Sequence, residues 1–336
     1  MKISIIGTGS IGKRHLKNCV LLKDELGLSE ITCYDTNKDR LKQLSEEVPG
    51  VRATGQLEEA VKKADALIIC VPTSRHIPVI SEISKTGRFH IYLEKPMSHT
   101  IEGCDELVFA QKRAGRVLAM GYMLPKHPVL LKTKEIIQGG ALGRILSVRA
   151  EAGLYLPKWH PWEDYRDFYM SWKTGGGGAL LDISHEIHYL QWFFGDIAEV
   201  KGYVGQISDL EISSDDIVTA LFQFKNGIYG ELHLDLLQFN VSRFCKIIGT
   251  EGVLIADLPT KTIRYHTKDN ESWNESKFDI DFDTIYHDQL RDFVAACQGK
   301  QTSLIMGESG LKTMQVIEGI RRSHAYSTTV KVPLFD

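Results

Sequence analysis

Residues 2–12 read KISIIGTGSIG, a short apolar run that leads directly into the pattern GxGxxG and then into a helical stretch. Gly7 permits a tight turn, Gly9 lets a pyrophosphate approach the backbone, and Gly12 allows a helix to pack closely on the strand. The free N–H groups at the start of that helix, with Ser10 and Ile11 among them, would face the phosphates. The pattern alone is weak, but its place between strand and helix favours a dinucleotide-binding loop over a glycine turn without a ligand.

An acidic residue follows the second predicted strand, where a ribose acceptor is expected about 20 residues beyond the glycines. Residues 30–34 form that strand, and Asp35 comes directly after it. A carboxylate accepts both ribose hydroxyls of NAD and repels the extra phosphate of NADP. No arginine follows Asp35 at once, although Lys38 is close enough to reach a phosphate. The sequence therefore predicts NAD as the cofactor, with NADP less favoured.

Short β-branched runs alternate with helical stretches through roughly the first 120 residues. The predicted strands are residues 2–6, 30–34, 66–70, 91–94 and 117–120, and the predicted helices include 11–26, 38–47 and 57–62. This alternation implies right-handed crossovers and a parallel sheet that is buried on both faces. We therefore predict an α/β protein whose residues 1–121 form an NAD-binding Rossmann domain with a doubly wound sheet.

The pattern changes after residue 122, where alternating strands and turn signals dominate. Predicted strands are 145–152, 218–224, 228–236, 244–249, 253–257 and 262–266, and predicted helices are 129–138, 184–193, 286–298 and 307–323. We predict that residues 122–336 form an α+β domain with a large, mostly antiparallel sheet that binds substrate and mediates oligomerisation. The final helix is expected to pack back toward the Rossmann domain.

Bulk composition excludes several classes of protein. The 336 residues carry a formal net charge of −3, which argues against a nucleic-acid or anionic-membrane surface. No apolar stretch is long enough to span a bilayer. The six cysteines are far apart and form no CxxC pair, which indicates reduced thiols in a cytoplasmic protein, with neither disulfides nor a bound metal.

The strand at residues 91–94 ends in Glu94-Lys95-Pro96. Ligands of doubly wound sheets bind at the carboxyl ends of the strands, so Lys95 is expected near the nicotinamide. A partly desolvated lysine beside a cationic ring has its ammonium form disfavoured and can exchange a proton with a sugar hydroxyl. The chemistry of these residues alone leaves open a simple surface ion pair between Glu94 and Lys95.

These segments together resemble the glucose–fructose oxidoreductase, inositol dehydrogenase and rhizopine-catabolism family (Gfo/Idh/MocA). The resemblance rests on GTGSIG, on Val71-Pro72-Thr73, on Glu94-Lys95-Pro96, on Gly121-Tyr122, and on the glycine run before Asp182, and it covers essentially the whole chain. It implies that Lys95 is catalytic and that Tyr122 lines the substrate. It further implies that the loop with Pro72, Thr73 and His76 lines the cofactor. Glu94 is expected to bind the cofactor as well.

A second candidate constellation lies at residues 182–189, which read DISHEIHY. Ser184 is a suitable N-cap, and Asp182 and His185 are three apart at a helix mouth, where they are expected to share one face. The positive end of a helix favours the neutral form of a histidine in the first turn, and a neutral imidazole can accept a hydroxyl proton. Asp182 can orient the imidazole or bind a sugar hydroxyl. A capping or core histidine is the alternative for His185.

The same stretch departs from the family pattern. Many members carry an aspartate four residues before the catalytic histidine and another three after it, whereas here Leu181 and His188 hold those places. Residues 182–189 are similar to the motif DxSHExDY, which occurs in one branch of the family. That branch is associated with surface-glycan and nonulosonic acid pathways. His185 carries over from that motif, and Asp182 carries over less securely.

An aromatic loop at residues 154–172 is the third candidate feature. Trp159 and Tyr165 could stack on a sugar face, and Arg166 could pair with a carboxylate or phosphate of the substrate. An aromatic wall between domains or subunits is the alternative.

The favoured interpretation is an NAD-dependent sugar oxidoreductase in which Lys95 and His185 handle the hydroxyl proton. Two others stay open: an epimerase, lyase or glycosidase that oxidises its substrate transiently and retains NAD, and a non-catalytic sensor that binds the cofactor. The exposed face of the antiparallel sheet is expected to form a homodimer or homotetramer, as in the family.

Overall fold

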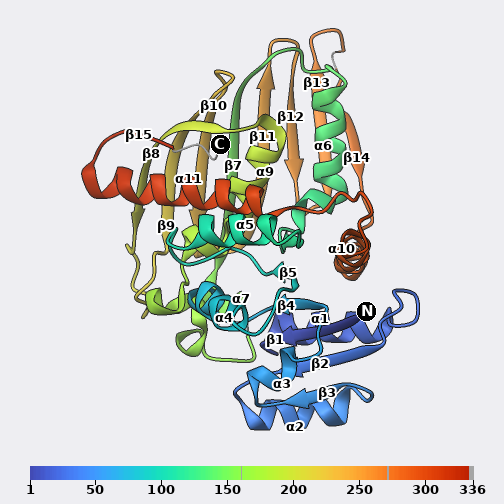
Figure 1. The fold of residues 1–336 in the computed structure, drawn as a ribbon. Coiled ribbons are helices and arrows are strands. Elements are labelled where there is room, and N and C mark those ends of the chain that lie inside the picture. The colour runs from blue at the N-terminus through green and yellow to red at the C-terminus, as the bar shows by residue number, and fades with distance from the viewer. Residues whose placement is uncertain (160, 271, 333–336) are drawn as a thin grey trace. The chain divides into compact units, whose positions relative to one another are not determined.

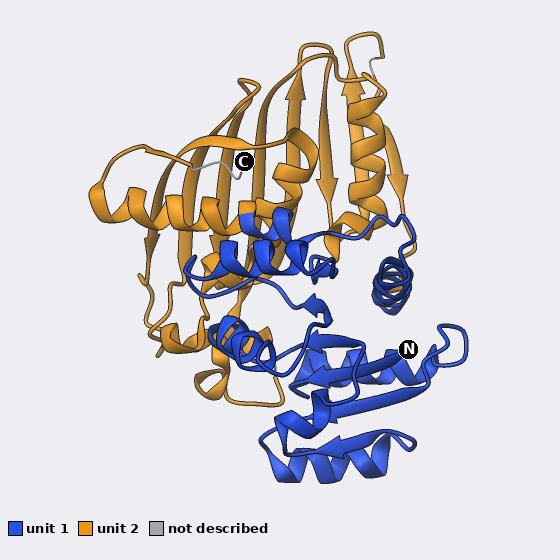
Figure 2. Ribbon diagram, viewed as in Figure 1, with its two compact units in different colours: residues 1–122, 282–311 blue, residues 123–281, 312–336 orange. Residues whose placement is uncertain are grey.

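The computed structural model describes residues 1–159, 161–270 and 272–332 (Figure 1), and the chain divides into two compact units (Figure 2). The first unit contains residues 1–122 and 282–311, and the second contains residues 123–281 and 312–336. The first unit is therefore built from two separate segments of the chain.

The first unit contains a fully parallel sheet with the strand order β3-β2-β1-β4-β5-β6. Its strands are β1 Lys2–Ile6, β2 Glu30–Tyr34, β3 Arg52–Thr54, β4 Ala66–Ile69, β5 His90–Leu93 and β6 Leu118–Met120. The order reverses between β1 and β4, and this switch point is where doubly wound sheets bind ligands, at the carboxyl ends of their strands. The predicted Rossmann sheet is confirmed. The three-residue edge strand β3 was not predicted, because it is too short to show a pattern.

Helices cover the parallel sheet on both sides. They are α1 Ser10–Leu21, α2 Lys38–Glu47, α3 Leu57–Val61, α4 His76–Ile83, α5 Cys104–Arg113 and α10 Phe282–Cys297. The core joins Ile3 and Ile5 of β1 to Leu16 of α1 and to Leu290 and Phe293 of α10. Burial of these α10 side chains stabilises the unit through the hydrophobic effect, which explains why residues 282–311 belong to it.

The second unit contains a larger sheet with the order β14-β13-β12-β11-β7-β10-β9-β8-β15. Its strands are β7 Ile145–Tyr155, β8 Ile197–Gly205, β9 Ile217–Phe224, β10 Tyr229–Asp235, β11 Leu237–Gly249, β12 Gly252–Asp257, β13 Thr262–Thr267, β14 Asn274–Lys277 and β15 Val330–Lys331. Among these strands only β7 and β10 pair in parallel. The predicted, mostly antiparallel sheet is confirmed.

One face of this sheet is covered by helices (Figure 1). They are α6 Pro128–Gln138, α9 His185–Phe194 and the part of α11 Gly307–Tyr326 that belongs to the second unit, and the short helices α7 Leu156–Trp159 and α8 Ala179–Asp182 lie in the same unit. In β9, Val218 and Ala220 point to the covered face and are buried, whereas Leu221 on the other face is exposed. Within the described residues, no helix is of the length and apolarity that crossing a membrane requires.

Candidate functional site

The glycine loop between β1 and α1 forms an open cradle. Gly7 has a φ of +92°, and a Cβ atom there would lie 2.8 Å from the backbone of Cys70. A Cβ atom at Gly12 would clash with the carbonyl oxygen of Gly7, so α1 can approach the strand only because Gly12 has no side chain. A Cβ atom at Gly9 would meet no atom within 4 Å. The space beside Gly9 and the helix N-terminus at Ser10 and Ile11 therefore fits the diphosphate of a dinucleotide.

Asp35 lies at the end of β2, beside this loop, and its carboxylate is held by the protein. Oδ2 accepts hydrogen bonds from the Thr8 backbone N (2.8 Å) and the Thr8 hydroxyl (2.7 Å), and Oδ1 accepts one from the Asn37 N (2.9 Å). Burial alone would raise the pKa of Asp35, but these hydrogen bonds and one from Arg40 outweigh it and lower the pKa. The carboxylate is therefore ionised at neutral pH and can accept ribose hydroxyls.

Arg40 is a residue near the cofactor loop that sequence analysis missed. Its Nη1 donates to Asp35 Oδ2 at 3.0 Å, although no arginine follows Asp35 directly in the sequence. The Asn37 side chain caps α2 by accepting from the Arg40 backbone N, which places Arg40 in the first turn of the helix. Recognising Asn37 as an N-cap would have revealed this, because first-turn side chains lie beside the strand end that precedes them.

The Glu94-Lys95-Pro96 turn follows β5, at the same edge of the sheet. The Lys95–Pro96 peptide bond is cis. Glu94 is only 8% exposed, so its carboxylate lies below the surface. Its Oε1 lies 2.7 Å from His15 Nε2, its Oε2 accepts from the Lys95 backbone N at 3.2 Å, and a Cβ atom at Gly121 would lie 2.7 Å from it. The carboxylate is thus enclosed directly before Lys95.

The loop after β4 contains the other residues predicted to line the cofactor. Pro72 is exposed and Thr73 is buried. His76 is also buried, and its two ring nitrogens lie 2.9 Å from the Pro96 carbonyl oxygen and 3.0 Å from that of Val71. Burial lowers the pKa of His76. The structure therefore brings the glycine loop, Asp35, this loop and the Lys95 turn to one edge of the parallel sheet.

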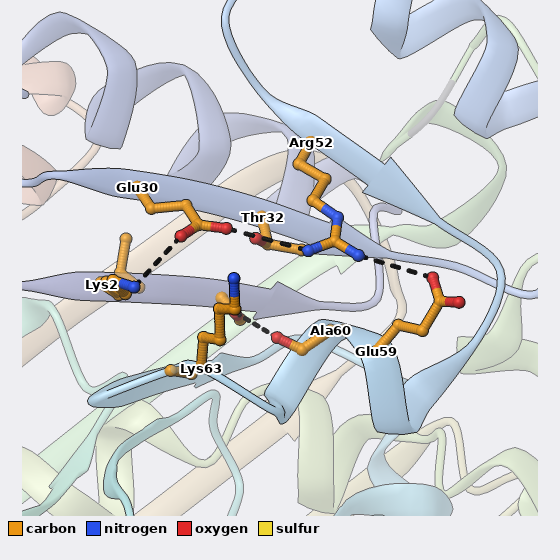
Figure 3. Close-up of a pocket in the computed structure, with 10 residues that line it drawn as sticks. Lys2, Glu30, Thr32, Arg52, Glu59, Ala60 and Lys63 are labelled. Carbon is orange, nitrogen blue, oxygen red and sulfur yellow. Dashed lines mark hydrogen bonds and ion pairs between the residues drawn. The ribbon is translucent and has the colours of Figure 1, made fainter.

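A cavity of about 10 Å³ lies near the opposite edge of that sheet (Figure 3). Lys2 and Arg52 contact Glu30 at 3.5 and 3.9 Å, and Arg52 contacts Glu59 at 3.7 Å. These charges neutralise one another at the amino ends of β1 and β2. The cavity is far too small for a dinucleotide, and its lining residues are not candidates for the site.

Asp182 ends the short helix α8 and is buried in the second unit. Its Oδ1 accepts from the Tyr169 hydroxyl at 2.8 Å and its Oδ2 from the Gly178 backbone N at 3.0 Å. Asp182 therefore fastens the glycine run at residues 175–178 to the preceding loop. Asp182 precedes the predicted helix 184–193, which the structure has as α9, and it ends a separate short helix, α8. Ser184 holds the N-cap position but makes no capping hydrogen bond.

His185 is the first residue of α9 and is 9% exposed. The next residue, Glu186, is fully buried and accepts hydrogen bonds from Arg243 Nε (2.7 Å) and Nη2 (3.0 Å). Burial works against the charge of Arg243, but Glu186 outweighs it and raises the arginine pKa. His188 follows His185 by three residues on α9. Burial lowers the pKa of His188 to about 3, so this imidazole is neutral at pH 7.

The aromatic loop exposes its side chains to different degrees. Trp159 lies at the end of α7 and is exposed, and Tyr165 is half-buried. Arg166 is exposed, and its guanidinium binds Asp164 at 2.6 Å and Glu211 at 3.1 Å. A substrate carboxylate would have to compete with both. Tyr122, which ends the first segment of the first unit, is buried.

No cluster of three His, Cys, Asp or Glu side chains that could hold a metal ion occurs among residues 1–159, 161–270 and 272–332. The six cysteines are free thiols, and all but Cys297 are buried.

Two family models match the chain. Residues 1–122 match the NAD-binding Rossmann fold of an oxidoreductase family, and residues 130–255 match the GFO/IDH/MocA C-terminal domain. A curated relative, the myo-inositol 2-dehydrogenase of Thermotoga maritima, is 24% identical over 344 residues, with 99% of this chain and 98% of the relative covered.

Solved structures of the same fold cover the whole chain. Levoglucosan dehydrogenase in complex with NADH has a TM-score of 0.87 at 20% identity, with 100% of both chains covered. The WlbA dehydrogenase of Bordetella pertussis, in complex with NADH and UDP-GlcNAcA, has a TM-score of 0.82 at 22% identity, with 100% of this chain and 99% of that chain covered. These likenesses support the fold described above.

Proposed function

Because this chain belongs to the GFO/IDH/MocA oxidoreductases, which it matches in two models at residues 1–122 and 130–255, we propose that it transfers hydride between NAD and a carbinol carbon of a cyclic polyol or sugar. The observation that carries the proposal is the position of Lys95. It follows β5 at the carboxyl edge of the sheet, in the same unit as the glycine cradle and Asp35. NAD-binding enzymes of this fold carry out their chemistry at that edge.

The residues of this chain would divide the work as follows. The loop Gly7–Gly12 holds the diphosphate, Asp35 accepts the ribose hydroxyls, and Pro72 and Thr73 line the cofactor. When bound in this cradle, NAD would supply the hydride chemistry of the reaction.

Lys95 and His185 would handle the proton of the substrate hydroxyl, which must leave as the C–O bond becomes a carbonyl. An imidazole at the start of a helix favours its neutral form and can accept that proton. Asp182, which fastens the glycine run before α9, would keep His185 in place. Tyr122, Trp159 and Tyr165 are proposed to line the sugar.

The substrate is proposed to be an uncharged ring with several hydroxyls. Arg166 is already neutralised by Asp164 and Glu211, so it offers little attraction to an acidic sugar. The names of two relatives, myo-inositol 2-dehydrogenase and levoglucosan dehydrogenase, describe neutral substrates of this class. The DISHEIHY motif supports the other class, sugar acids of surface-glycan pathways, and that class would require Arg166 to release its two partners.

A substrate panel tests this function. Purified protein would be mixed with NAD and with myo-inositol, levoglucosan, glucose or UDP-GlcNAcA, and the absorbance of reduced nicotinamide would be followed. Neutral polyols are expected to be oxidised and UDP-GlcNAcA to react poorly. Absence of reduced nicotinamide with every compound, although NADH binds, would contradict the proposal. Product that forms without net reduction of NAD would identify the alternative, transient oxidation with retained cofactor.

We also propose that the protein is a cytoplasmic homo-oligomer. The uncovered face of the second sheet exposes large apolar side chains, which include Tyr203, Leu221 and Tyr229 on neighbouring strands. Exposed large apolar side chains on one face of a sheet are typical of a protein interface. Sedimentation of the wild type as a dimer or tetramer, and of Leu221→Lys as a smaller species, would support it. A monomeric wild type would contradict it.

A further inference from the structure

Two buried histidines contact the Lys95 turn from opposite ends. His15 lies on α1 and binds the carboxylate of Glu94, the residue before Lys95, at 2.7 Å. His76 lies at the start of α4, and its Nδ1 is 2.9 Å from the carbonyl oxygen of Pro96, the residue after Lys95. Both histidines, like the whole turn, belong to the first unit.

His15 links the turn to the phosphate cradle. It follows Gly12 by three residues on α1, so the helix that begins at the diphosphate site also carries the imidazole that holds Glu94. The ring packs edge-on against Tyr92 at 5.2 Å and Tyr286 at 6.0 Å between centroids, which restricts its orientation. A shift of α1 would therefore move the Glu94 carboxylate.

The Glu94 carboxylate connects His15 to the Lys95 backbone, and it has little room to move. Its Oε2 accepts from the Lys95 backbone N, and Gly121 leaves space for the carboxylate only by having no side chain. Burial, together with the charge of Glu94, raises the pKa of the Tyr92 and Tyr286 phenols, which agrees with an enclosed carboxylate.

His76 links the turn to the loop that lines the cofactor. Its Nε2 lies 3.0 Å from the Val71 carbonyl oxygen, while Nδ1 contacts Pro96. A neutral imidazole carries one N–H, so its tautomer decides which of the two carbonyl oxygens receives the hydrogen bond. The ring is buried between the loop after β4 and the Lys95 turn and fixes the gap between them.

We propose that His15 and His76 are positioning residues that clamp the Lys95 turn and set the position of the ammonium group relative to the cofactor. The inference rests on the proposed role of Lys95 in proton transfer. A catalytic group displaced by about 1 Å can lose about 100-fold in rate, so buried contacts on both sides of one lysine are expected to matter for turnover. Neither histidine needs to touch substrate for this effect.

The test compares four variants. His15→Leu removes the hydrogen bond to Glu94, and His15→Gln keeps an N–H donor of similar reach. His76→Leu removes the contacts to Pro96 and Val71. Tyr92→Phe is the matched control, because it removes a neighbouring buried hydrogen bond to Gln289 (3.2 Å) and keeps the ring that packs on His15.

Two readouts are taken. The first is kcat and KM for NAD and polyol, where His15→Leu and His76→Leu are expected to lower kcat by about 10- to 100-fold with less than a threefold change in KM for NAD. His15→Gln and Tyr92→Phe are expected to stay within about threefold of the wild type. The second readout is independent of turnover: the acetylation rate of Lys95 by a small reagent, measured by mass spectrometry relative to exposed Lys42. It is expected to change by more than about twofold in the two leucine variants only.

The outcomes separate the clamp from the proposed function. If His15→Leu and His76→Leu fold and show the wild-type Lys95:Lys42 acetylation ratio, the clamp is wrong whatever the enzyme does. If that ratio changes while the wild-type protein oxidises no compound of the panel, the clamp holds and the proposed activity fails. Two kinetic results would also overturn the positioning role. The first is that His15→Leu and His76→Leu change only KM for NAD, and the second is that kcat falls as far in His15→Gln as in His15→Leu.

Discussion

The Lys95 turn in the first unit and the His185 turn in the second are built in similar ways. Each candidate proton-handling residue stands beside a buried glutamate, and each glutamate is held by a basic side chain from a distant segment. The partners differ, because Glu94 is bound by one imidazole nitrogen of His15, whereas Glu186 is bound by two guanidinium nitrogens of Arg243.

Because of this difference, we expect the Glu186 contact to matter for folding stability and the Glu94 contact to matter for the position of Lys95. A guanidinium stays charged at all relevant pH values and binds a carboxylate through two parallel hydrogen bonds, so its loss leaves an uncompensated buried charge. A single imidazole contact is weaker, and Glu94 retains the Lys95 N–H when it is removed. We infer that the His185 turn depends on its ion pair for folding, and that the Lys95 turn depends on its hydrogen bond for geometry.

The largest effect is expected for His185→Asn. Removal of a general base lowers kcat by about 10²- to 10⁴-fold, while NADH affinity is expected to stay unchanged because the residues proposed to hold the cofactor are not altered. Stopped-flow kinetics and NADH fluorescence titration measure the two quantities. A variant that keeps wild-type kcat would remove His185 from the mechanism and break the parallel between the two turns.

The next effect is on stability. Arg243→Leu leaves Glu186 buried without its partner and is expected to lower the free energy of unfolding by about 3–5 kcal/mol. His15→Leu is expected to cost only about 1–3 kcal/mol, the cost of one lost hydrogen bond to a buried group.

Urea unfolding measures both values. The control is the double variant Arg243→Leu/Glu186→Gln, which removes the stranded charge and is expected to recover part of the loss. Equal destabilisation by Arg243→Leu and His15→Leu would show that the two turns depend equally on their basic partners for folding.

The free energy of unfolding is expected to depend on pH because of His188, a buried residue of the second unit. Burial lowers the pKa of His188 to about 3, whereas an unfolded histidine has a pKa near 6.5. The unfolded chain therefore binds a proton that the folded chain does not, and stability falls as the pH drops below about 6.5. From pH 7 to pH 5 the loss is about 2 kcal/mol for this residue.

Urea unfolding at the two pH values is expected to show a loss in the wild type that is about 2 kcal/mol larger than the loss in His188→Gln. An identical pH dependence in both proteins would mean that His188 is not buried in its neutral form.

The smallest effect concerns cofactor choice in the first unit. Arg40 lies beside Asp35 and could approach a ribose 2′-phosphate, so Arg40→Ala is expected to lower kcat/KM for NADP about 10-fold more than for NAD. Lys42→Ala, which alters an exposed lysine on the same helix, is the control. Parallel changes for NAD and NADP would show that Arg40 only supports Asp35.

Much of the first unit could be predicted from the sequence because its signals are local. The glycine pattern, Asp35 and the buried strands each depend on residues near in sequence, and β1 and β2 match their predicted bounds, Lys2–Ile6 and Glu30–Tyr34.

The residues that hold the catalytic candidates could not be predicted in this way. His15 meets Glu94 across 79 positions and Arg243 meets Glu186 across 57, and nothing in the local pattern joins such pairs. Strand β8 Ile197–Gly205 was also missed, since its exposed Lys201 and Tyr203 weaken the apolar alternation. Contacts of this kind follow from the fold, and only the structure reveals them.

The role of Lys95 is tested most directly by single-turnover hydride transfer in Lys95→Ala. With saturating NAD and an oxidisable polyol, reduced nicotinamide is expected to form at least about 100-fold more slowly than in the wild type, and small alkylamines are expected to restore part of the rate. Formation at the wild-type rate without added amine would contradict the account.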